Sequence, residues 1–269
     1  MKFVYFGYDF SLPSLKRLVD DGNELIALFT FPCDNVFNFN KSITAFGTKQ
    51  GVPVHIKPPK PKEIQELIDK GAEFFLSAGY PYKIPPIDEK KAYGLNCHPT
   101  YLPMGRGLMP TPIILLEEPD AGGFTVHKLT PEFDAGDILY QEKIEVNDET
   151  TVDSYSEDIA KRSPQALSKI IANLEETWTN AAPQDHNKAS VFKQPDDAMR
   201  TLHWHRSARD LDRILRAFGT FGSLSHINGR THAIFKHRTI FEPHAYEPGM
   251  VVEATDDYKK IAVGKTPED

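Results

Sequence analysis

An asparagine, a histidine and an aspartate carry the chemistry that this sequence offers most clearly. Asn96 and His98 stand two residues apart in the run Gly94–His98, whose apolar character is typical of a strand, so their side chains point to the same face. Pro99 ends the strand just beyond them. Asp134 follows in an acidic turn with a glycine, which can bend a carboxylate back towards a site. An amide, an imidazole and a carboxylate together suit acyl transfer to an amine.

Each of these groups has a role when an amine attacks a formyl carbon. Asn96 and a protonated His98 can donate hydrogen bonds to the oxyanion, and His98 can give its proton to the departing nitrogen. Asp134, if it lies close, raises the pKa of His98, keeps it charged near neutrality and helps to remove the proton of the amine. Taken alone, however, each residue also has an ordinary structural explanation in a loop or turn. The residue types by themselves predict only a polar site at the strand ends.

The first half of the chain alternates strand-like apolar runs with helical patterns. The strand-like runs are Phe3–Phe6, Leu25–Thr30, Val52–Val54, Phe74–Leu76 and Gly94–His98, and the helical ones are Ser11–Asp21, Ser42–Lys49 and Ile64–Ile68. This alternation predicts right-handed crossovers and an α/β, Rossmann-like, mainly parallel sheet. Ligands of such sheets bind at the carboxyl ends of the strands, and Asn96 and His98 lie at such an end.

The pattern changes after Gly122. Phe124–His127 and Ile138–Tyr140 predict a hairpin-like pair, and Thr151–Trp178 a long helix that Pro164 should kink or restart. The remaining signals are an amphipathic helix over Ala208–Phe218 and short β segments with turns at Asn228-Gly229 and Pro248-Gly249. We therefore expect a catalytic domain over residues 1–182, a polar linker over 183–194 and a small β-rich domain over 195–269.

Composition limits the partners of the protein. The 269 residues, 40% of them hydrophobic, suffice for one large domain and a smaller one. The sequence shows no apolar run that could span a membrane and no signal-peptide pattern. The two cysteines, Cys33 and Cys97, argue against a disulfide framework and favour the cytoplasm. The net charge of −7 disfavours nucleic acid, because phosphate binding draws on clustered Lys and Arg.

Several elements resemble the signature of the 10-formyltetrahydrofolate-dependent formyltransferases. They read Asn-x-His-Pro-(Ser/Thr)-x-Leu-Pro, Gly-Arg-Gly, Gly-x-Thr-x-His and Asp-x-Gly-Asp-Ile-Leu, and here they occupy Asn96–Pro103, Gly105–Gly107, Gly123–His127 and Asp134–Leu139. The resemblance implies a Rossmann-like formyltransferase fold with a small, open-barrel-like C-terminal domain. It further implies 10-formyltetrahydrofolate as the co-substrate, no metal, and Asn96, His98 and Asp134 as the catalytic residues.

The resemblance also implies binding residues by their position. Those implied for folate are Tyr82, Lys83, Ile84, Leu108, Thr130, Pro131, Glu132 and Phe133. Those implied for the acceptor substrate are Tyr8, Met104, Arg106 and Gly107. The chain departs from the family at Thr100, which replaces the commoner Ser but keeps the hydroxyl, and at Cys97, where a hydrophobic residue is usual. Cys97 should face away from Asn96 and His98 and pack as a small core residue rather than act as a nucleophile.

The sequence says less about the identity of the acceptor amine than about the reaction. Methionyl-tRNA formyltransferases resemble this chain but grip tRNA with a Lys/Arg-rich insertion after the second strand, where residues 32–40 of this chain hold no Lys or Arg. A start at Phe6-Gly7-Tyr8 and a Thr-x-x-x-Asp-Asn run resemble enzymes that formylate nucleotide-linked amino sugars, and Phe37 and Phe39 could stack on a base. We expect such a sugar as the acceptor, with no membrane partner. The alternatives are a small amine such as an amino acid or hydroxyornithine, methionyl-tRNA, water in a hydrolase, or no reaction in a binding module. The C-terminal domain could bind substrate or form a homodimer.

Overall fold

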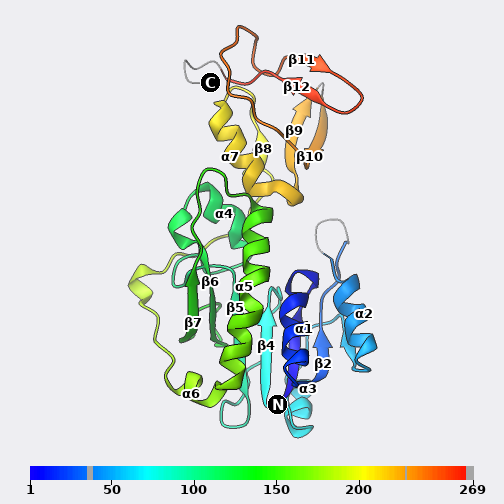
Figure 1. Cartoon of the computed structure of the whole chain (residues 1–269), viewed down its shortest axis with the longest axis vertical. Helices are drawn as coiled ribbons and strands as arrows, with labels where there is room; N and C mark the ends of the chain where they lie inside the picture. Colours follow the sequence, from blue (N-terminus) through cyan, green and yellow to red (C-terminus); the bar gives the residue numbers. More distant parts are fainter. Residues whose placement is uncertain (35–38, 228, 265–269) are drawn as a thin grey trace.

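A central sheet with helices on both faces forms the larger part of the computed structural model (Figure 1). The structure describes residues 1–34, 39–227 and 229–264. Within these ranges the sheet has seven strands in the order β3-β2-β1-β4-β5-β6-β7. The strands are β1 (Lys2–Gly7), β2 (Glu24–Phe29), β3 (Val54–His55), β4 (Phe74–Ala78), β5 (Tyr93–His98), β6 (Gly123–Lys128) and β7 (Ile138–Lys143). Neighbours are parallel as far as β5, while β6 and β7 run antiparallel, so the predicted mainly parallel sheet and the hairpin-like pair are confirmed.

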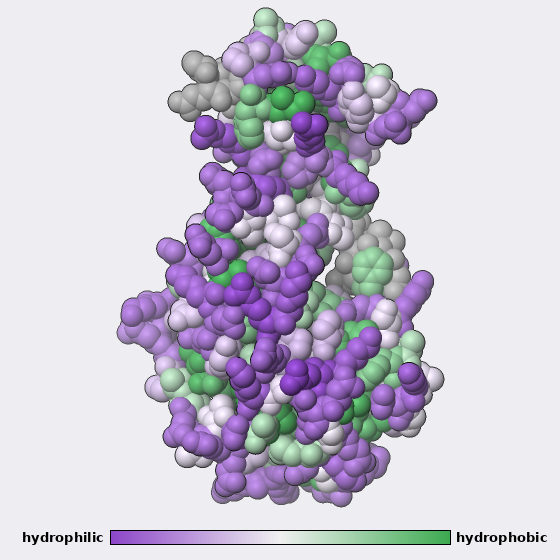
Figure 2. Space-filling view, in the orientation of Figure 1, coloured by the Kyte–Doolittle hydropathy of each residue, from purple (hydrophilic) through white to green (hydrophobic). Residues whose placement is uncertain are grey.

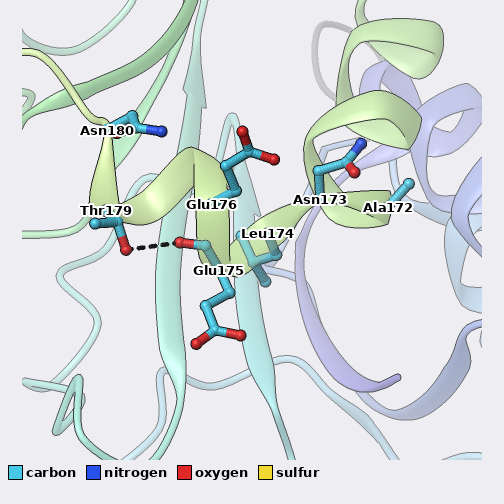
Figure 3. Close-up of a pocket in the computed structure, with 7 residues that line it drawn as sticks. All are labelled: Ala172, Asn173, Leu174, Glu175, Glu176, Thr179 and Asn180. Carbon is cyan, nitrogen blue, oxygen red and sulfur yellow. Dashed lines mark hydrogen bonds between the residues drawn. The ribbon is translucent and has the colours of Figure 1, made fainter.

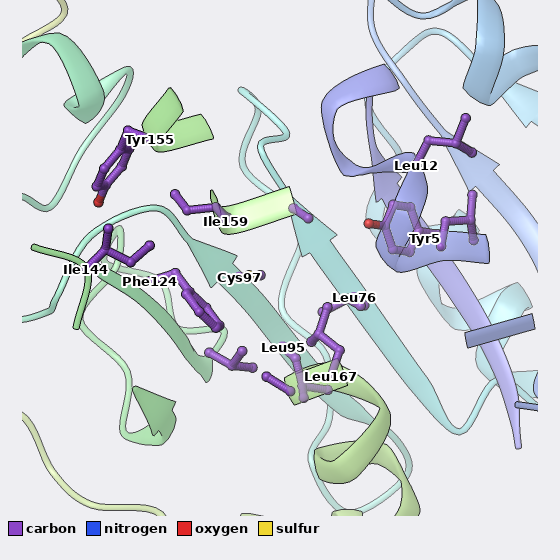
Figure 4. Close-up of a cluster of buried hydrophobic side chains, with 14 of the residues drawn as sticks. Tyr5, Leu12, Leu76, Leu95, Cys97, Phe124, Ile144, Tyr155, Ile159 and Leu167 are labelled. Carbon is purple, nitrogen blue, oxygen red and sulfur yellow. The ribbon is translucent and has the colours of Figure 1, made fainter. Parts of the chain in front are cut away.

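Alternate residues of the central strands bury opposite faces of the sheet. Phe3 and Tyr5 pack into one hydrophobic cluster, whereas Val4 and Phe6 pack into the other. The first cluster joins strand residues to α1 and α5, which lie side by side across the sheet (Figures 1 and 4). The helices of this part are α1 (Leu12–Asp20), α2 (Lys41–Lys49), α3 (Pro61–Asp69), α4 (Pro110–Leu116), α5 (Val152–Ala172) and α6 (Leu174–Thr179). Burial on both faces explains why these strands read as continuous apolar runs.

The long helix differs from its prediction at one point. It continues through Pro164 and ends at Ala172, and α6 begins at Leu174, so the helix does not restart at Pro164. Packing of Ile159, Leu167 and Ile170 into the core compensates for the hydrogen bond that Pro164 cannot donate. The break at Asn173 borders a hollow lined by residues 172–176, 179 and 180, with Thr179 donating to the carbonyl of Glu175 (2.9 Å; Figure 3). This hollow includes none of the predicted site residues.

In the described residues, the C-terminal region consists of one α-helix, a short 3-10 helix (η4, Gly219–Phe221) and two small sheets. The elements are β8 (Thr201–Leu202), α7 (Ala208–Phe218), β9 (Ser223–Ile227), β10 (Arg230–Ile234), β11 (Val251–Ala254) and β12 (Lys259–Ile261). The sheets are β10-β9-β8 and β11-β12, so residues 195–227 and 229–264 form no closed barrel. The hydroxyl of Ser207 caps α7 by accepting from the amide of Asp210. Of the predicted Asn228-Gly229 turn, Asn228 lies outside the described residues.

The C-terminal region shares the main core but also exposes apolar side chains. Leu211, Ile214 and Phe218 of α7 belong to the same buried cluster as the central sheet, and α7 packs against α4. Phe241 and Tyr258 are more than half exposed, and hydrophobic patches lie among hydrophilic ones on this part of the surface (Figure 2). No helix within the described residues is long and apolar enough to cross a membrane.

Candidate active site

A cavity lies at the carboxyl ends of the strands, where the strand order reverses between β1 and β4. Doubly wound sheets bind their ligands at such a reversal, because the neighbouring loops diverge there. The cavity has a volume of about 770 Å³. Ala78 and His98, the last residues of β4 and β5, line it together with loops that follow β5 and β6.

Asn96, His98 and Asp134 meet in this cavity. The Nδ2 of Asn96 donates to Oδ1 of Asp134 at 3.2 Å, and Nδ1 of His98 lies 3.4 Å from the same oxygen. All three residues line the cavity, although His98 and Asp134 are buried. The expected convergence of an amide, an imidazole and a carboxylate, distant in the chain, is therefore present in the structure.

A second histidine completes the group and fixes the orientation of Asn96. His127 stands opposite Asn96 in the β5–β6 ladder, and its Nδ1 lies 2.8 Å from the carbonyl oxygen of Lys128. A carbonyl can only accept, so Nδ1 carries a proton. In the neutral ring Nε2 then accepts from Nδ2 of Asn96 at 3.1 Å. Both amide hydrogens of Asn96 are thus held, one by His127 and one by Asp134.

The carboxylate of Asp134 is stabilised in its ionised form. Burial alone would raise its pKa, but the nearby imidazoles of His98 and His127 and the hydrogen bond from the Gly107 amide together hold the pKa of Asp134 well below 3.8. The Gly107 amide donates to Oδ2 at 2.9 Å. Since amide donors stabilise a carboxylate whatever the charge of the neighbouring imidazoles, Asp134 is ionised throughout the neutral range.

The charge of His98 corrects the expectation from the sequence. Burial is the largest influence and lowers the pKa of His98 below 6.5, although Asp134 and the hydrogen bond to Gly105 both act to raise it. Burial thus favours the neutral imidazole in the free protein, against the expectation that Asp134 keeps His98 charged. Its Nε2 lies 2.9 Å from the carbonyl oxygen of Gly105 and so carries the proton, which leaves Nδ1 free to accept one.

The backbone of Asp134 adopts a conformation that few residues other than glycine use. Its φ is +55°, a left-handed value that costs about 1–2 kcal/mol for an L-residue with a side chain. Such a residue persists only where its surroundings hold it in place. Here the Gly107 amide holds the carboxylate, while the side-chain amide of Gln184 donates to the carbonyl oxygen of Asp134 at 2.9 Å.

The residues implied for folate all line the cavity. Tyr82, Lys83, Ile84, Leu108, Thr130, Pro131, Glu132 and Phe133 lie around its opening. The side chain of Lys83 joins two of these loops, because its Nζ donates to the carbonyl of Pro131 at 3.1 Å and lies 5.1 Å from the ring centre of Phe133.

The residues implied for the acceptor divide into two pairs. Tyr8 and Gly107 line the cavity, whereas Met104 and Arg106 do not. Met104 packs against the main hydrophobic core, and the guanidinium of Arg106 contacts Gln184 and His186. Phe39 is 41% exposed and does not line the cavity, and Phe37 lies outside the described residues.

Three features of the site went unpredicted. His127 belongs to the Gly-x-Thr-x-His element, and its cross-strand pairing with Asn96 could have been inferred from a correct β5–β6 register. Gln184 lies in the predicted linker, where no periodic pattern marks it. The aromatic wall formed by Tyr8, Phe10 and Phe31, with ring centres 5.8 and 5.5 Å from that of Tyr8, joins segments from two separate strand ends.

Cys97 behaves as the sequence predicts. It is 8% exposed and belongs to the main hydrophobic core, where Figure 4 shows it among the side chains of the sheet. Burial raises the pKa of its thiol to about 12. The thiol is therefore protonated at neutral pH, and Cys97, although it also lines the cavity, is unsuited to act as a nucleophile.

Comparison with known proteins agrees with this geometry. Residues 42–171 match the formyl transferase family. The methionyl-tRNA formyltransferase of Bacillus subtilis (strain 168) is 24% identical over 267 residues, covering 95% of this chain and 84% of that protein. The corresponding enzyme of Hydrogenovibrio crunogenus is also 24% identical, over 96% of this chain and 85% of its own length.

Solved structures share the fold at lower identity. A sugar N-formyltransferase from Shewanella sp FDAARGOS_354 aligns with a TM-score of 0.70 at 18% identity, covering 90% of this chain and 98% of that one. An N-formyltransferase from Helicobacter canadensis, in complex with folinic acid and dTDP-3-aminofucose, has a TM-score of 0.65 at 16% identity, covering 97% and 95%. HypX from Aquifex aeolicus in complex with tetrahydrofolic acid has a TM-score of 0.72 at 16% identity, covering 98% of this chain and 42% of that one.

The matched segment contains Asn96, His98, His127 and Asp134, together with the lining residues between 77 and 134, whereas Tyr8, Phe10 and Phe31 lie outside it. On this match, residues 42–171 of the chain resemble the formyl transferase family, and the fold and the site described above agree with that resemblance.

Proposed function

We propose that this protein is an N-formyltransferase that moves a formyl group from 10-formyltetrahydrofolate to a primary amine. The observation that carries the proposal is the contact of Asn96 and His98 with one carboxylate oxygen of Asp134 inside the cavity. An amide donor, a proton-accepting imidazole and an ionised carboxylate around one point are the groups that acyl transfer to an amine requires.

The neutral state of His98 decides the order of proton transfers. The amine nitrogen attacks the formyl carbon, and Nδ1 of His98 accepts the proton that the amine loses. Asp134, 3.4 Å from Nδ1, stabilises the imidazolium that forms. The carbon–nitrogen bond to the folate then breaks, and the imidazolium returns the proton to the departing nitrogen. The products are the formylated amine and tetrahydrofolate, and His98 ends neutral as it began.

Asn96 acts beside this proton relay. Its amide is oriented by His127 and Asp134, so it is already fixed when the oxyanion develops and loses no further conformational freedom. Asp134 and His127 hold both of its hydrogens in the free protein. One of these hydrogen bonds must therefore be shared with the oxyanion as negative charge grows on it.

The cavity fits a folate on physical grounds. Tyr82, Leu108 and Phe133 are 40%, 41% and 47% exposed, and large apolar side chains exposed around an opening are typical of a binding site. All three line the cavity, as does the loop 130–134. A flat aromatic ring system placed between these loops would cover them from water and bring its formyl group towards His98.

For the acceptor we propose the amino group of a nucleotide-linked amino sugar. The similar structure from Helicobacter canadensis contains dTDP-3-aminofucose, and that from Shewanella is a sugar N-formyltransferase. The aromatic side chains of Tyr8, Phe10 and Phe31 line the cavity here and offer faces on which a base or sugar can stack.

Methionyl-tRNA is the second candidate acceptor. The similar proteins from Bacillus subtilis and Hydrogenovibrio crunogenus are methionyl-tRNA formyltransferases. The net charge of −7 and the absence of Lys or Arg from residues 32–40 argue against it, since tRNA binding depends on contacts between cations and phosphates.

The proposal is tested by supplying the purified protein with 10-formyltetrahydrofolate and separate amines. The panel comprises dTDP-linked 3- and 4-amino sugars, free amino acids and charged methionyl-tRNA, with mass spectrometry of each product. We expect N-formylation of a nucleotide-linked amino sugar. Formate release without any acceptor would instead identify a hydrolase, and inertness towards every amine would contradict formyl transfer.

A further inference from the structure

The predicted linker packs against the loops that carry the catalytic groups. Gln184 is 6% exposed, and its Nε2 donates to the carbonyl oxygens of Asp134 (2.9 Å) and Gly136 (2.7 Å). Its Oε1 accepts from the guanidinium of Arg106 at 3.2 and 2.6 Å. The amide therefore uses both of its hydrogens and its oxygen, and it joins the loop of residues 105–107 to the turn of residues 134–136.

Both joined segments touch the reacting groups. The carbonyl oxygen of Gly105 accepts from His98, and the Gly107 amide donates to Asp134. Main-chain hydrogen bonds add to this contact: the Arg106 amide donates to the Ser190 carbonyl at 3.0 Å, and the Phe192 amide donates to the Arg106 carbonyl at 2.8 Å. The segment of residues 184–192 thus holds the loop that positions the imidazole and the carboxylate.

Arg106 is oriented towards this segment rather than towards the cavity. Its guanidinium contacts Gln184 and His186, and the residue is 9% exposed and does not line the cavity. A buried guanidinium needs hydrogen-bond acceptors, and the side chains of Gln184 and His186 supply them. Arg106 therefore fixes the amide of Gln184 with its N–H groups directed at Asp134 and Gly136.

We propose that Gln184 is a positioning residue for formyl transfer, and that Arg106 acts through Gln184 instead of contacting the acceptor. The inference rests on the proposed function. Gln184 holds the left-handed backbone of Asp134, so that the carboxylate stays within reach of Asn96 and His98. Misplacement of a catalytic group by about 1 Å costs about 100-fold in rate, so loss of this contact affects turnover more than substrate binding.

The test compares Gln184→Met with Gln184→Glu. Methionine keeps the approximate volume but removes every hydrogen bond, whereas glutamate keeps the acceptor for Arg106 and lacks the N–H groups for the two carbonyls. We expect kcat to fall about 10- to 100-fold in both variants, with the KM of each substrate changed less than about 3-fold. Gln65→Met, at an exposed position of α3, is the matched control and keeps the wild-type kcat.

Hydrogen–deuterium exchange separates positioning from general loss of structure and needs no activity. In Gln184→Met we expect faster exchange in residues 104–108 and 132–137, and unchanged exchange in β1 and β4. If the protein formylates no amine, the proposed function fails, but the exchange result still tests the contact. If Gln184→Met is unfolded, Gln184→Glu and the Arg106 variant provide the test.

The role of Arg106 is tested by a double-mutant cycle. If Arg106 acts through Gln184, the Arg106→Met/Gln184→Met protein has a kcat within about 3-fold of the slower single variant, because neither change adds to the other. Multiplicative losses, with a raised KM for the amine in Arg106→Met alone, would make Arg106 a substrate contact. A kcat within about 3-fold of wild type in folded Gln184→Met and Gln184→Glu would overturn the proposal for Gln184.

Discussion

Asp134 and Asp212 are two carboxylates whose pKa lies well below the ordinary value, and their surroundings differ. Burial acts to raise the pKa of both. Asp212, on α7, is held by an ion pair with Arg216 at 2.7 Å, a hydrogen bond from Thr239 at 2.6 Å and His237 at 3.6 Å. Asp134 is held by backbone and side-chain amides and by two histidines, and it lines the cavity.

The difference shows that a shifted pKa does not by itself identify a catalytic group. Asp212 has a cation fixed against it within the same helix and does not line the cavity, so its charge is already neutralised by the fold. Although the charge of Asp134 acts to raise the pKa of the buried Arg106, Asp134 forms no ion pair with any Lys or Arg within the described residues. It can therefore stabilise a positive charge that forms during reaction, on His98.

The largest expected effect comes from removing the groups that meet at Asp134. We predict that Asn96→Ala and His98→Ala each lower kcat about 100-fold or more, because each removes a donor or a proton acceptor at the reacting carbon. Steady-state assays with the amine that the panel experiment identifies measure this effect. Near-wild-type rates in both variants, with folding verified by circular dichroism, would remove the proposed mechanism.

Asp212→Asn is predicted to change stability instead of catalysis. It leaves the largely buried Arg216 without its carboxylate partner, and we expect the free energy of unfolding to fall by about 1–3 kcal/mol, with kcat within about 2-fold of wild type. Urea denaturation at pH 7 measures the first quantity. A large loss of kcat without a loss of stability would mean that the two carboxylates are not distinguished as proposed.

The stability effect of Asp212 should also depend on pH. Its pKa in the folded protein is lowered from 3.8, so the unfolded chain takes up the proton first as the pH falls. The stability that Asp212 contributes is therefore complete well above pH 3.8 and is lost as the pH falls through the lowered value. We expect wild type and Asp212→Asn to converge in stability towards acid pH, and a constant difference at every pH would contradict this assignment.

The smallest effect that we predict is a shift in the titration of His98. Its pKa in the free protein should lie below 6.5, and Asp134→Asn should lower it further, because the Asp134 carboxylate acts to raise it. Asp212→Asn should leave it unchanged. Nuclear magnetic resonance of the imidazole protons, assigned with a His98→Asn variant, provides the measurement. An unchanged or higher pKa in Asp134→Asn would show that Asp134 does not stabilise the imidazolium.

Some features of the fold and of the site could be predicted from the sequence alone. Asp134 lies far from Asn96 and His98 in the chain and is identified only by the order of the family motifs. The strand ends and the pair of Asn96 and His98 are local features, since a period of two sets both side chains on one face. The hairpin-like pair and the helix over Ala208–Phe218 were likewise predicted from periodicity and then confirmed. These features depend on residues close in the chain.

The parts that could not be predicted depend on distant contacts and on burial. The prediction that His98 is charged fails because burial lowers its pKa by more than Asp134 raises it. No sequence pattern shows how deeply a side chain is buried. The side-chain amide of Gln184 donates a hydrogen bond to the carbonyl oxygen of Asp134, fifty positions away in the chain. The segment around Gln184 has no periodic pattern that would predict this contact. Met104 and Arg106 lie beside the site but point elsewhere because the segment of residues 184–192 packs over their loop.

The central claim is that the carboxylate of Asp134 serves the reaction while that of Asp212 serves only the fold. Single-turnover transfer of a labelled formyl group from 10-formyltetrahydrofolate, measured side by side in Asp134→Asn and Asp212→Asn, tests it most directly. We predict a rate at least about 100-fold slower than wild type for Asp134→Asn and a rate within about 2-fold for Asp212→Asn. Equal rates in the two variants would contradict the account.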